Sequence, residues 1–228
     1  MNLENEKRLA AIEAVNYIKE GMTVGLGSGS TSVYMIKELG RRVLDGLKIK
    51  GVPSSEKIKQ LAEKSGISII SLDEVEKIDV NIDGADEFDP KLRLIKGGGG
   101  ALLREKIVAH NANYNIIMAD SSKQVERLGK FKLPIETIPF ATQSIFKELK
   151  NHGLSPKLRQ IDGGTYKTDQ NNDIIDLDIF DSPDLEGIDQ MLHNIPGIVE
   201  TGLFLNSTDL VIWSKGEGIR KIYKKDLG

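Results

Sequence analysis

The chain has 228 residues, of which 39% are hydrophobic and 29% are charged. These fractions are ordinary for globular proteins in water, and they exclude a disordered or fibrous chain. The formal net charge is −3, and the lysines and arginines are scattered, so the basic surface that binds nucleic acid or an anionic membrane is excluded.

The absence of cysteine excludes disulfides, thiolate catalysis and thiolate metal sites. The three histidines, His110, His152 and His193, show no metal-ligand spacing, so no metal is expected. The first residues, MNLENEKRLA, lack the pattern of a signal peptide, and no apolar run approaches the roughly 20 residues of a membrane span. We therefore expect a cytoplasmic protein without a membrane partner.

The predicted elements of the first 120 residues alternate between helices and strands. Apolar residues at helical spacing predict a helix over 3–20, which Gly21 closes. The following strands are predicted at 22–26, 47–52, 67–70, 80–83, 92–95 and 114–119, and the helices at 31–45, 54–65 and 100–112. This alternation predicts an α/β fold with a doubly wound, mostly parallel, Rossmann-like sheet that is covered on both faces.

The order of elements changes after residue 130. The pattern there predicts strands at 133–138, 157–162, 173–180 and 197–205, and helices at 141–151 and 184–193. The order βαββαβ is typical of a small ferredoxin-like domain. The segment DLVIW at 209–213 is expected to rejoin the main sheet. We therefore predict a Rossmann-like catalytic domain of residues 1–130 plus 207–228 and a small ferredoxin-like α/β domain of residues 131–206.

The glycine-rich segment GLGSGST at 25–31 follows a predicted strand and opens a helix. Backbone N–H groups and the helix dipole bind phosphate in such a setting. The P-loop lysine is missing, and Ser30 stands where the dinucleotide motif has its third glycine. Two interpretations remain: an anion site at Ser28, Gly29, Ser30 and Thr31, or a tight turn with Thr31 as the helix cap.

The acidic segment NIDGADEFDP at 81–90 directly follows a predicted buried strand, at the edge of the sheet where ligands bind. Its candidate binding residues are Asp83, Gly84, Ala85 and Asp86. A calcium loop is excluded because Pro90 stands where the bidentate glutamate should be. The alternative is a solvated acidic turn.

The segment LIKGGGGALLREK at 94–106 combines four glycines, which are poor residues for a helix or strand interior, with an unusually placed glutamate. The helical neighbours of Glu105 at three and four residues are all apolar: Ala101, Leu102, Val108 and Ala109. Burial would raise the pKa of Glu105 toward the value that a general base needs. The alternative is a glutamate at the edge of the apolar stripe, or one paired with a distant lysine.

Lys96 precedes these glycines, and Lys123 follows the predicted strand at 114–119. Each lysine alone is more often solvated than functional. A doubly wound sheet, however, brings its strand ends to one edge, so both should meet the anion loop and the carboxylates. This set suits proton abstraction next to a carbonyl in a phosphorylated small molecule, with an enediol intermediate.

The segments GLGSGST, DGADEFDP and KGGGGALLREK, in this order and spacing, closely resemble the A-type ribose-5-phosphate isomerase family over nearly the whole chain. Ser28 stands where the family often has threonine, and the hydroxyl is retained. The resemblance implies reversible conversion of D-ribose 5-phosphate to D-ribulose 5-phosphate, in the non-oxidative pentose phosphate branch and without a cofactor. It also implies a homodimer or homotetramer.

The resemblance further implies roles for individual residues. Glu105 would move the proton between C2 and C1, while Lys96 would stabilise the enediolate with the amides of Gly97, Gly98 and Gly99. Asp83 and Asp86 would bind sugar hydroxyls, with Asp83 assisting ring opening. The remaining substrate contacts would come from Ser28, Gly29, Ser30 and Thr31 near the phosphate, with added charge from Lys123 and Lys7.

Two other classes share part of this pattern. A CoA-transferase subunit has a similar fold and uses a glutamate as nucleophile, but DGADEFDP suits a polyhydroxyl ligand better than CoA. A sugar-phosphate sensor on the same scaffold should carry a DNA-binding segment, and no basic patch is present.

Overall fold

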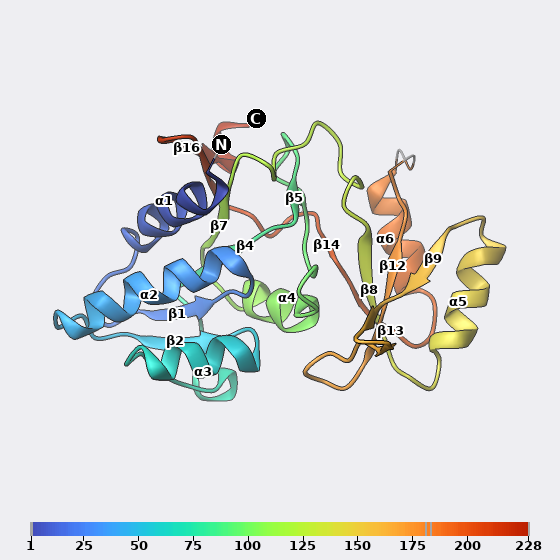
Figure 1. Ribbon diagram of the computed structural model, residues 1–228, viewed down its shortest axis with the longest axis horizontal. Helices are drawn as coiled ribbons and strands as arrows, with labels where there is room; N and C mark the ends of the chain where they lie inside the picture. Colours follow the sequence, from blue (N-terminus) through green and yellow to red (C-terminus); the bar gives the residue numbers. More distant parts are fainter. Residues whose placement is uncertain (1, 181, 183, 228) are drawn as a thin grey trace.

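The computed structural model describes residues 2–180, 182 and 184–227. Figure 1 shows two groups of elements side by side, each built around its own sheet. Within the described part of the chain, no helix is long and apolar enough to cross a membrane.

The larger sheet has seven strands in the order β16-β15-β7-β4-β1-β2-β3. These strands are β1 (Thr23–Leu26), β2 (Lys50–Pro53), β3 (Ser68–Ile69), β4 (Val80–Gly84), β7 (Asn115–Ala119), β15 (Leu210–Lys215) and β16 (Gly218–Tyr223). All neighbours are parallel except β15 and β16. The chain runs outward in opposite directions from β1 and from β4, so the predicted doubly wound sheet is confirmed and its switch point lies between these two strands.

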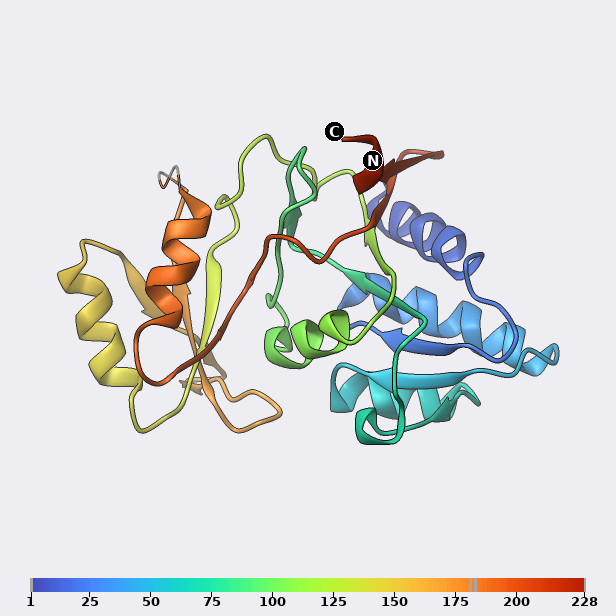
Figure 2. The ribbon, with the colours of Figure 1, turned by 180° about the vertical axis from the view of Figure 1, so that it is seen from behind.

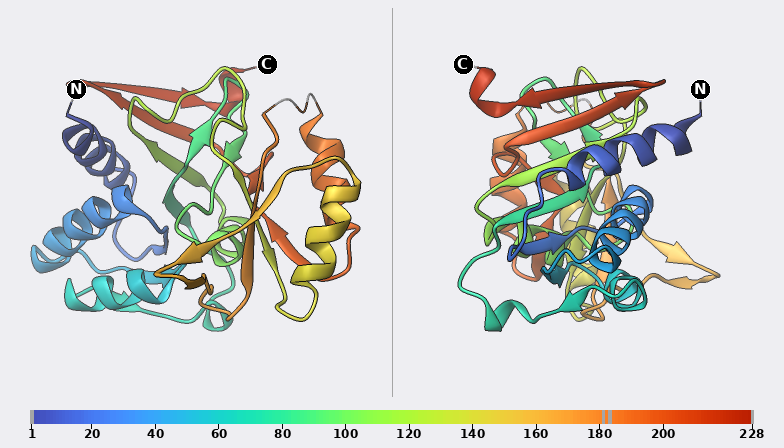
Figure 3. Two further views of the ribbon diagram at one scale, coloured as in Figure 1. Left: turned by 45° about the vertical axis from the view of Figure 1, so that its right-hand side comes forward. Right: turned by 90° about the vertical axis from the view of Figure 1, so that its left-hand side faces the viewer.

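Helices cover both faces of this sheet, because its strands are apolar on both sides. Helices α1 (Leu3–Val15), α2 (Ser30–Leu44) and α3 (Glu56–Lys64) share one core, to which β7 contributes Ile116 and Met118. Helix α4 (Leu102–His110) lies on the other face, where Ile117 and Ala119 pack. Figure 3 shows α1 and α2 in front of the strands in its right-hand view. A short 3-10 helix, Leu72–Glu74, follows β3, and another, Lys224–Asp226, follows β16.

The first helix is shorter than the predicted range of 3–20, and a side chain from another helix contacts its end. Helix α1 ends at Val15 with Asn16 as its cap. The guanidinium of Arg42 on α2 donates to the carbonyl of Val15 at 3.2 Å and to the side chain of Asn16 at 2.6 Å. A distant cation thus satisfies the end of the helix, which the local apolar spacing did not reveal.

The smaller sheet is antiparallel, in the order β13-β8-β12-β9. Its elements are β8 (Leu133–Thr137), α5 (Thr142–Asn151), β9 (Pro156–Leu158), β12 (Asp173–Leu177), α6 (Leu185–His193) and β13 (Ile198–Thr201). The predicted βαββαβ order is confirmed, and this unit has a core of its own. The sequence reading missed a small hairpin of β10 (Gln160–Ile161) and β11 (Gly164–Thr165), which lies between β9 and β12. The domain limits at residues 131 and 206 stay a proposal, which the separate sheets and cores support.

A three-stranded sheet, β14-β6-β5, joins the two units. It contains β5 (Glu87–Phe88), β6 (Leu94–Ile95) and β14 (Leu203–Phe204). The strand predicted at 197–205 is divided at Gly202, whose carbonyl accepts from the amide of Lys96 at 2.9 Å and whose amide donates to Pro134 at 2.8 Å. A Cβ on Gly202 would lie 2.4 Å from the Lys96 carbonyl, so only glycine permits this approach. Figure 2 shows the chain after β14 returning to the main sheet.

Candidate active site

A cavity of about 80 Å³ opens at the carboxyl edge of β1 and β4, at the switch point of the main sheet. Drug-sized ligands occupy pockets of roughly 300–1,000 Å³, so this cavity suits a small molecule. Its lining comprises Ser28, Gly29, Ser30, Thr31, Gly84, Ala85, Asp86, Lys96, Gly97, Gly98, Gly99, Glu105 and Lys123.

The loop from β1 to α2 forms one wall of the cavity. Helix α2 begins at Ser30 with Gly29 as its N-cap, at a φ of 115°, and no side chain caps it. The alternative in which Thr31 caps the helix is therefore wrong. Among the described residues, the first amides of α2 have no side-chain acceptor, which is the usual geometry of an anion site.

Hydrogen bonds fix the position of Ser28, which lies two residues before the first residue of this helix. Its amide donates to Asp83 Oδ1 at 3.1 Å, and its hydroxyl lies 2.8 Å from the hydroxyls of both Ser54 and Ser55. The sequence reading missed these two serines, although they follow the second predicted strand and so lie at the same sheet edge. That position was the available signal.

Three buried charged groups meet beside the cavity: Asp83, Lys96 and Glu105. Lys96 Nζ lies 3.0 Å from Asp83 Oδ2 and 3.3 Å from Glu105 Oε1, and it donates to the Gly84 carbonyl at 2.6 Å. These contacts use all three donors of the ammonium group. Each of the three residues is at most 4% exposed. The cluster is therefore a fixed arrangement of charge rather than a set of mobile surface groups.

Glu105 has the properties of a base. Glu105 is buried, as its apolar neighbours on α4 predicted. Burial raises the pKa of its carboxyl to about 8, although the nearby Lys96 ammonium lowers that pKa. The carboxylates of Asp83 and Asp86 raise the pKa further. Glu105 Oε1 faces Lys96, whereas Oε2 has no hydrogen-bond partner among the residues that the structure describes. One oxygen of a carboxylate with a raised pKa is thus without a partner, in a residue that lines the cavity.

Of the two groups beside Glu105, Lys96 carries a fixed charge. Burial lowers the pKa of Lys96, but Asp83 and Glu105 raise it more, to about 12, so the ammonium keeps its proton. Burial raises the pKa of Asp83 above its ordinary value, and the lowering effects of Lys96 and of the Gly84 and Ser28 amides offset this only in part. Both oxygens of Asp83 are engaged, and Asp83 lies behind the residues that line the cavity.

Close contacts and left-handed backbone angles explain three of the four glycines at 97–100, and they differ from one position to the next. A Cβ on Gly98 would lie 2.6 Å from Asp86 Oδ1, and one on Gly100 would lie 2.1 Å from the Tyr166 hydroxyl. Gly97 and Gly100 have φ values of 97° and 81°, in the left-handed region. A Cβ on Gly99 would meet nothing within 4 Å. Contacts within the protein therefore require three of the glycines, and only Gly99 presents bare backbone to open space.

The two remaining predicted residues lie in different places. Lys123 lines the cavity, and its carbonyl accepts from the Phe88 amide at 2.8 Å, which ties its loop to β5. Lys7 on α1 pairs with Glu4 at 2.7 Å and is not part of the lining. The structure thus brings together every predicted site residue except Lys7. In the described ranges no group of three or more His, Asp or Glu side chains is arranged to hold a metal ion.

A buried acid–base cluster beside a small cavity, at the switch point of a doubly wound sheet, defines an α/β enzyme that acts on a small molecule. Comparison with known proteins specifies the class. The family model of ribose 5-phosphate isomerase A (phosphoriboisomerase A) matches residues 50–218. The chain belongs to this family and is an isomerase.

The similarity extends over whole chains. The ribose-5-phosphate isomerase A of Streptococcus mutans is 43% identical over 219 residues, which cover 96% of this chain and 97% of that protein. A solved D-ribose-5-phosphate isomerase is 42% identical, with a TM-score of 0.94, and covers 98% of this chain and 100% of its own. The enzyme from Methanocaldococcus jannaschii is 39% identical, with a TM-score of 0.92 and coverages of 96% and 99%. The transferase and sensor alternatives are therefore set aside.

Proposed function

We propose that this protein interconverts D-ribose 5-phosphate and D-ribulose 5-phosphate through an enediol intermediate, with Glu105 as the base. The observation that carries this proposal is the buried Glu105 carboxylate, which lines the cavity, whose pKa is raised to about 8 and whose Oε2 has no hydrogen-bond partner among the described residues. Family membership supports the substrate. One solved relative is in complex with phospho-erythronic acid, a phosphorylated sugar acid, which is the kind of ligand the proposal requires.

In the proposed reaction, Glu105 removes the proton from C2 of the open-chain aldose and returns it to C1. A second proton moves from the hydroxyl on C2 to the oxygen on C1, so the atoms balance without an oxidant. While Glu105 is neutral, the negative charge lies on the enediolate. Lys96 keeps its charge and lies 3.3 Å from Glu105, so its positive charge stabilises the nearby enediolate through electrostatic attraction.

The other residues bind and orient the substrate. We assign the phosphate to the open amides of Ser28 to Thr31 at the start of α2, with Lys123 adding charge. Asp86 lines the cavity and is placed to accept sugar hydroxyls. Asp83 pairs with Lys96 but does not itself line the cavity. Its predicted part in ring opening therefore requires it to act on a sugar from which the lining residues separate it. Lys7 stays a prediction without a contact to the cavity.

The proposal includes an assembly and a location. We propose a homodimer or homotetramer in the cytoplasm, acting in the non-oxidative pentose phosphate branch, with no cofactor in the steps assigned above. Family membership supports the pathway.

The direct test is to treat the purified protein with a chelator, incubate it with ribose 5-phosphate and measure the ketopentose phosphate. Glu105→Gln should lower kcat by about 10²–10⁴-fold, since that is the usual contribution of a general base. Binding of phospho-erythronic acid should persist in this variant. Glu126→Gln, which changes an exposed glutamate, is the matched control and should behave as wild type. An inactive wild-type protein, or a Glu105→Gln variant with normal turnover, would refute the proposal.

A further inference from the structure

Three hydrogen bonds run from the small unit onto the carbonyls of the glycine loop. Arg159, which directly follows β9, donates from Nη1 to the carbonyls of Gly97 at 2.9 Å and Gly98 at 3.1 Å. The Tyr166 hydroxyl donates to the carbonyl of Gly99 at 2.9 Å. Three consecutive carbonyls of the loop are therefore held by side chains that lie about 60 residues later in the sequence.

Arg159 is itself fixed. Its Nε donates to Asp176 Oδ2 on β12 at 2.9 Å, and its Nη2 donates to Asp176 Oδ1, so the pair is bidentate. The guanidinium lies 5.8 Å from the ring centroid of Tyr166, and the Tyr166 amide donates to the Arg159 carbonyl at 3.0 Å. The Arg159 side chain is 13% exposed. The donors that contact the loop thus have one preferred orientation.

A carbonyl that is held in place also orients the next amide. Because the peptide group is planar and trans, the N–H of the following residue points opposite to the carbonyl. The Gly97 carbonyl fixes the amide of Gly98, which donates to Asp86 Oδ2 at 2.7 Å. The Gly99 carbonyl fixes the amide of Gly100, which donates back to the Gly97 carbonyl at 2.9 Å.

The peptide between Gly98 and Gly99 differs from these two. Arg159 holds its carbonyl, but its N–H, on Gly99, has no recorded acceptor among the described residues. Gly98 lines both the active-site cavity and a second groove; Arg159 lines the second groove, whereas Gly99 lines the cavity. The Gly99 N–H, opposite to the carbonyl that Arg159 holds, is therefore directed to the cavity side.

We propose that Arg159 and Tyr166 are positioning residues for the isomerisation, which hold the glycine loop so that the Gly99 amide donates to the enediolate. This inference rests on the proposed function and adds a part of the small unit to it. Asp176 supports the arrangement by orienting Arg159. A preorganised donor of this kind stabilises charge that develops in the transition state, so its loss should lower kcat more than it raises KM.

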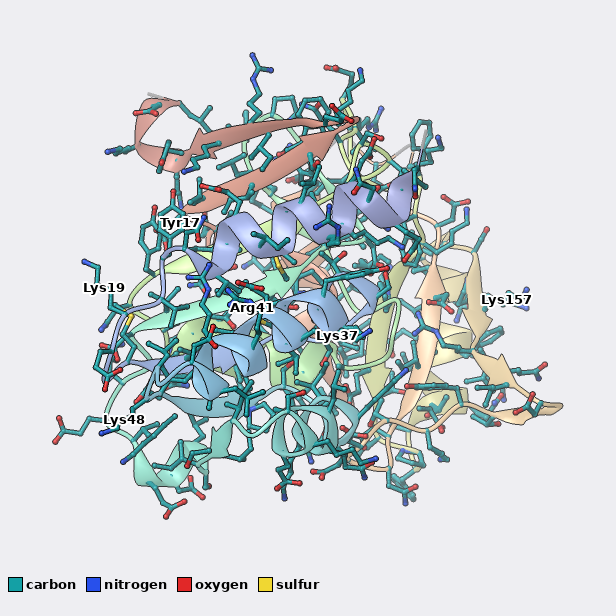
Figure 4. The ribbon with its side chains drawn as sticks, turned by 60° about the vertical axis from the view of Figure 1, so that its left-hand side comes forward. Tyr17, Lys19, Lys37, Arg41, Lys48 and Lys157 are labelled. Carbon is teal, nitrogen blue, oxygen red and sulfur yellow. The ribbon has the colours of Figure 1, made fainter. Side chains whose placement is uncertain are left out.

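The test compares four single variants in the full-length protein, one of which, Arg159→Lys, is the conservative replacement. Arg159→Met removes both carbonyl contacts, and Tyr166→Phe removes one hydroxyl. Lys157→Met is the matched control: Lys157 is exposed on β9, lines the same groove and projects outward from the small unit in Figure 4. Steady-state kinetics with ribose 5-phosphate, competitive inhibition by phospho-erythronic acid and by inorganic phosphate, and a thermal unfolding scan are measured for each.

Arg159→Met should lower kcat by about 10–100-fold, the cost of misplacing a group by about 1 Å, with a much smaller change in KM. Its affinity for phospho-erythronic acid should fall with kcat, whereas its affinity for inorganic phosphate should stay near that of wild type, because the loop serves the reacting end. Arg159→Lys should recover part of the rate. Lys157→Met should match wild type.

The outcomes separate this inference from the proposed function. If wild type isomerises ribose 5-phosphate and Arg159→Met keeps kcat within about threefold, the positioning role is refuted. It is also refuted if phosphate affinity falls as much as kcat, since the loss is then general. If Arg159→Met does not fold, Tyr166→Phe decides: an unchanged kcat refutes the role, and a loss of about threefold or more with unchanged phosphate affinity supports it.

Discussion

Replacing Glu105 by glutamine should make the protein more stable while it inactivates it. The folded-state pKa of Glu105 is about 8, against an ordinary value of 4.5, and burial is the main cause. Between pH 4.5 and about pH 8 the carboxyl is protonated in the folded state but ionised in the unfolded state, so the free energy of unfolding falls as the pH rises. Glutamine has no charge to bury and does not carry this cost.

The size of the effect follows from the two pKa values. One pKa unit corresponds to about 1.4 kcal/mol, so the ionised carboxylate costs about 5 kcal/mol of folding free energy once the pH exceeds 8. At pH 5, where Glu105 is largely protonated in the folded state, the cost is below about 1 kcal/mol. The stability gain of Glu105→Gln should therefore grow by about 4 kcal/mol between pH 5 and pH 9.

Urea unfolding at pH 5, 7 and 9 would measure this gain, with the fluorescence of the single tryptophan, Trp213 on β15, as the signal. Glu126→Gln at the surface controls for the removal of one negative charge. A Glu105→Gln variant that is no more stable than wild type at pH 9, or that shows the same gain at pH 5, would contradict the reasoning. A stable but inactive variant would mean that the enzyme keeps a buried carboxylate that destabilises the fold but is needed for its chemistry.

Three further results are expected. The kcat/KM of wild type should rise about tenfold per pH unit in the acid range and level off near pH 8, because Glu105 must be ionised; a profile that is flat from pH 6 to 9 would exclude it as the titrating base. Lys123→Ala should raise KM about tenfold with little change in kcat, and an unchanged KM would show that Lys123 does not contact the phosphate. Gly98→Ala, whose methyl would meet the Asp86 carboxylate at 2.6 Å, should lower kcat at least about tenfold. Gly164→Ala meets nothing closer than 3.8 Å and should turn over normally.

Much of the fold was predictable because its signals are local. Strands such as Asn115–Ala119 are apolar and bounded, and the alternation of strands and helices predicted the doubly wound sheet, although the strand order and the switch point came only from the structure. The two-residue strand Glu87–Phe88 gave no periodic signal and was interpreted only as part of an acidic segment. Its place in a sheet depends on a partner strand, and its backbone contact with Lys123 depends on the tertiary structure.

The site divides in the same way. The burial of Glu105 was predictable because its helical neighbours, which lie on the same face of α4, are all apolar. The place of Lys96 in the site was predictable from its position at the sheet edge. Arg159 and Tyr166 were not, because nothing near them in the sequence shows that they contact a loop more than 60 residues away. The glycines were recognised as a place of close approach, but the sequence could not show that Asp86 and Tyr166 cause most of it.

The insertion of β15 between β7 and β16 also has a consequence for biosynthesis. All five residues of β7 are buried, and one edge of this strand is paired only by Leu210 to Trp213, near the end of the chain. A ribosome makes β7 about 90 residues before its partner strand, so the nascent chain carries an apolar, unpaired strand edge throughout the later part of its synthesis. Premature termination within the last 20 or so residues would then yield an aggregating product rather than a weakly active one.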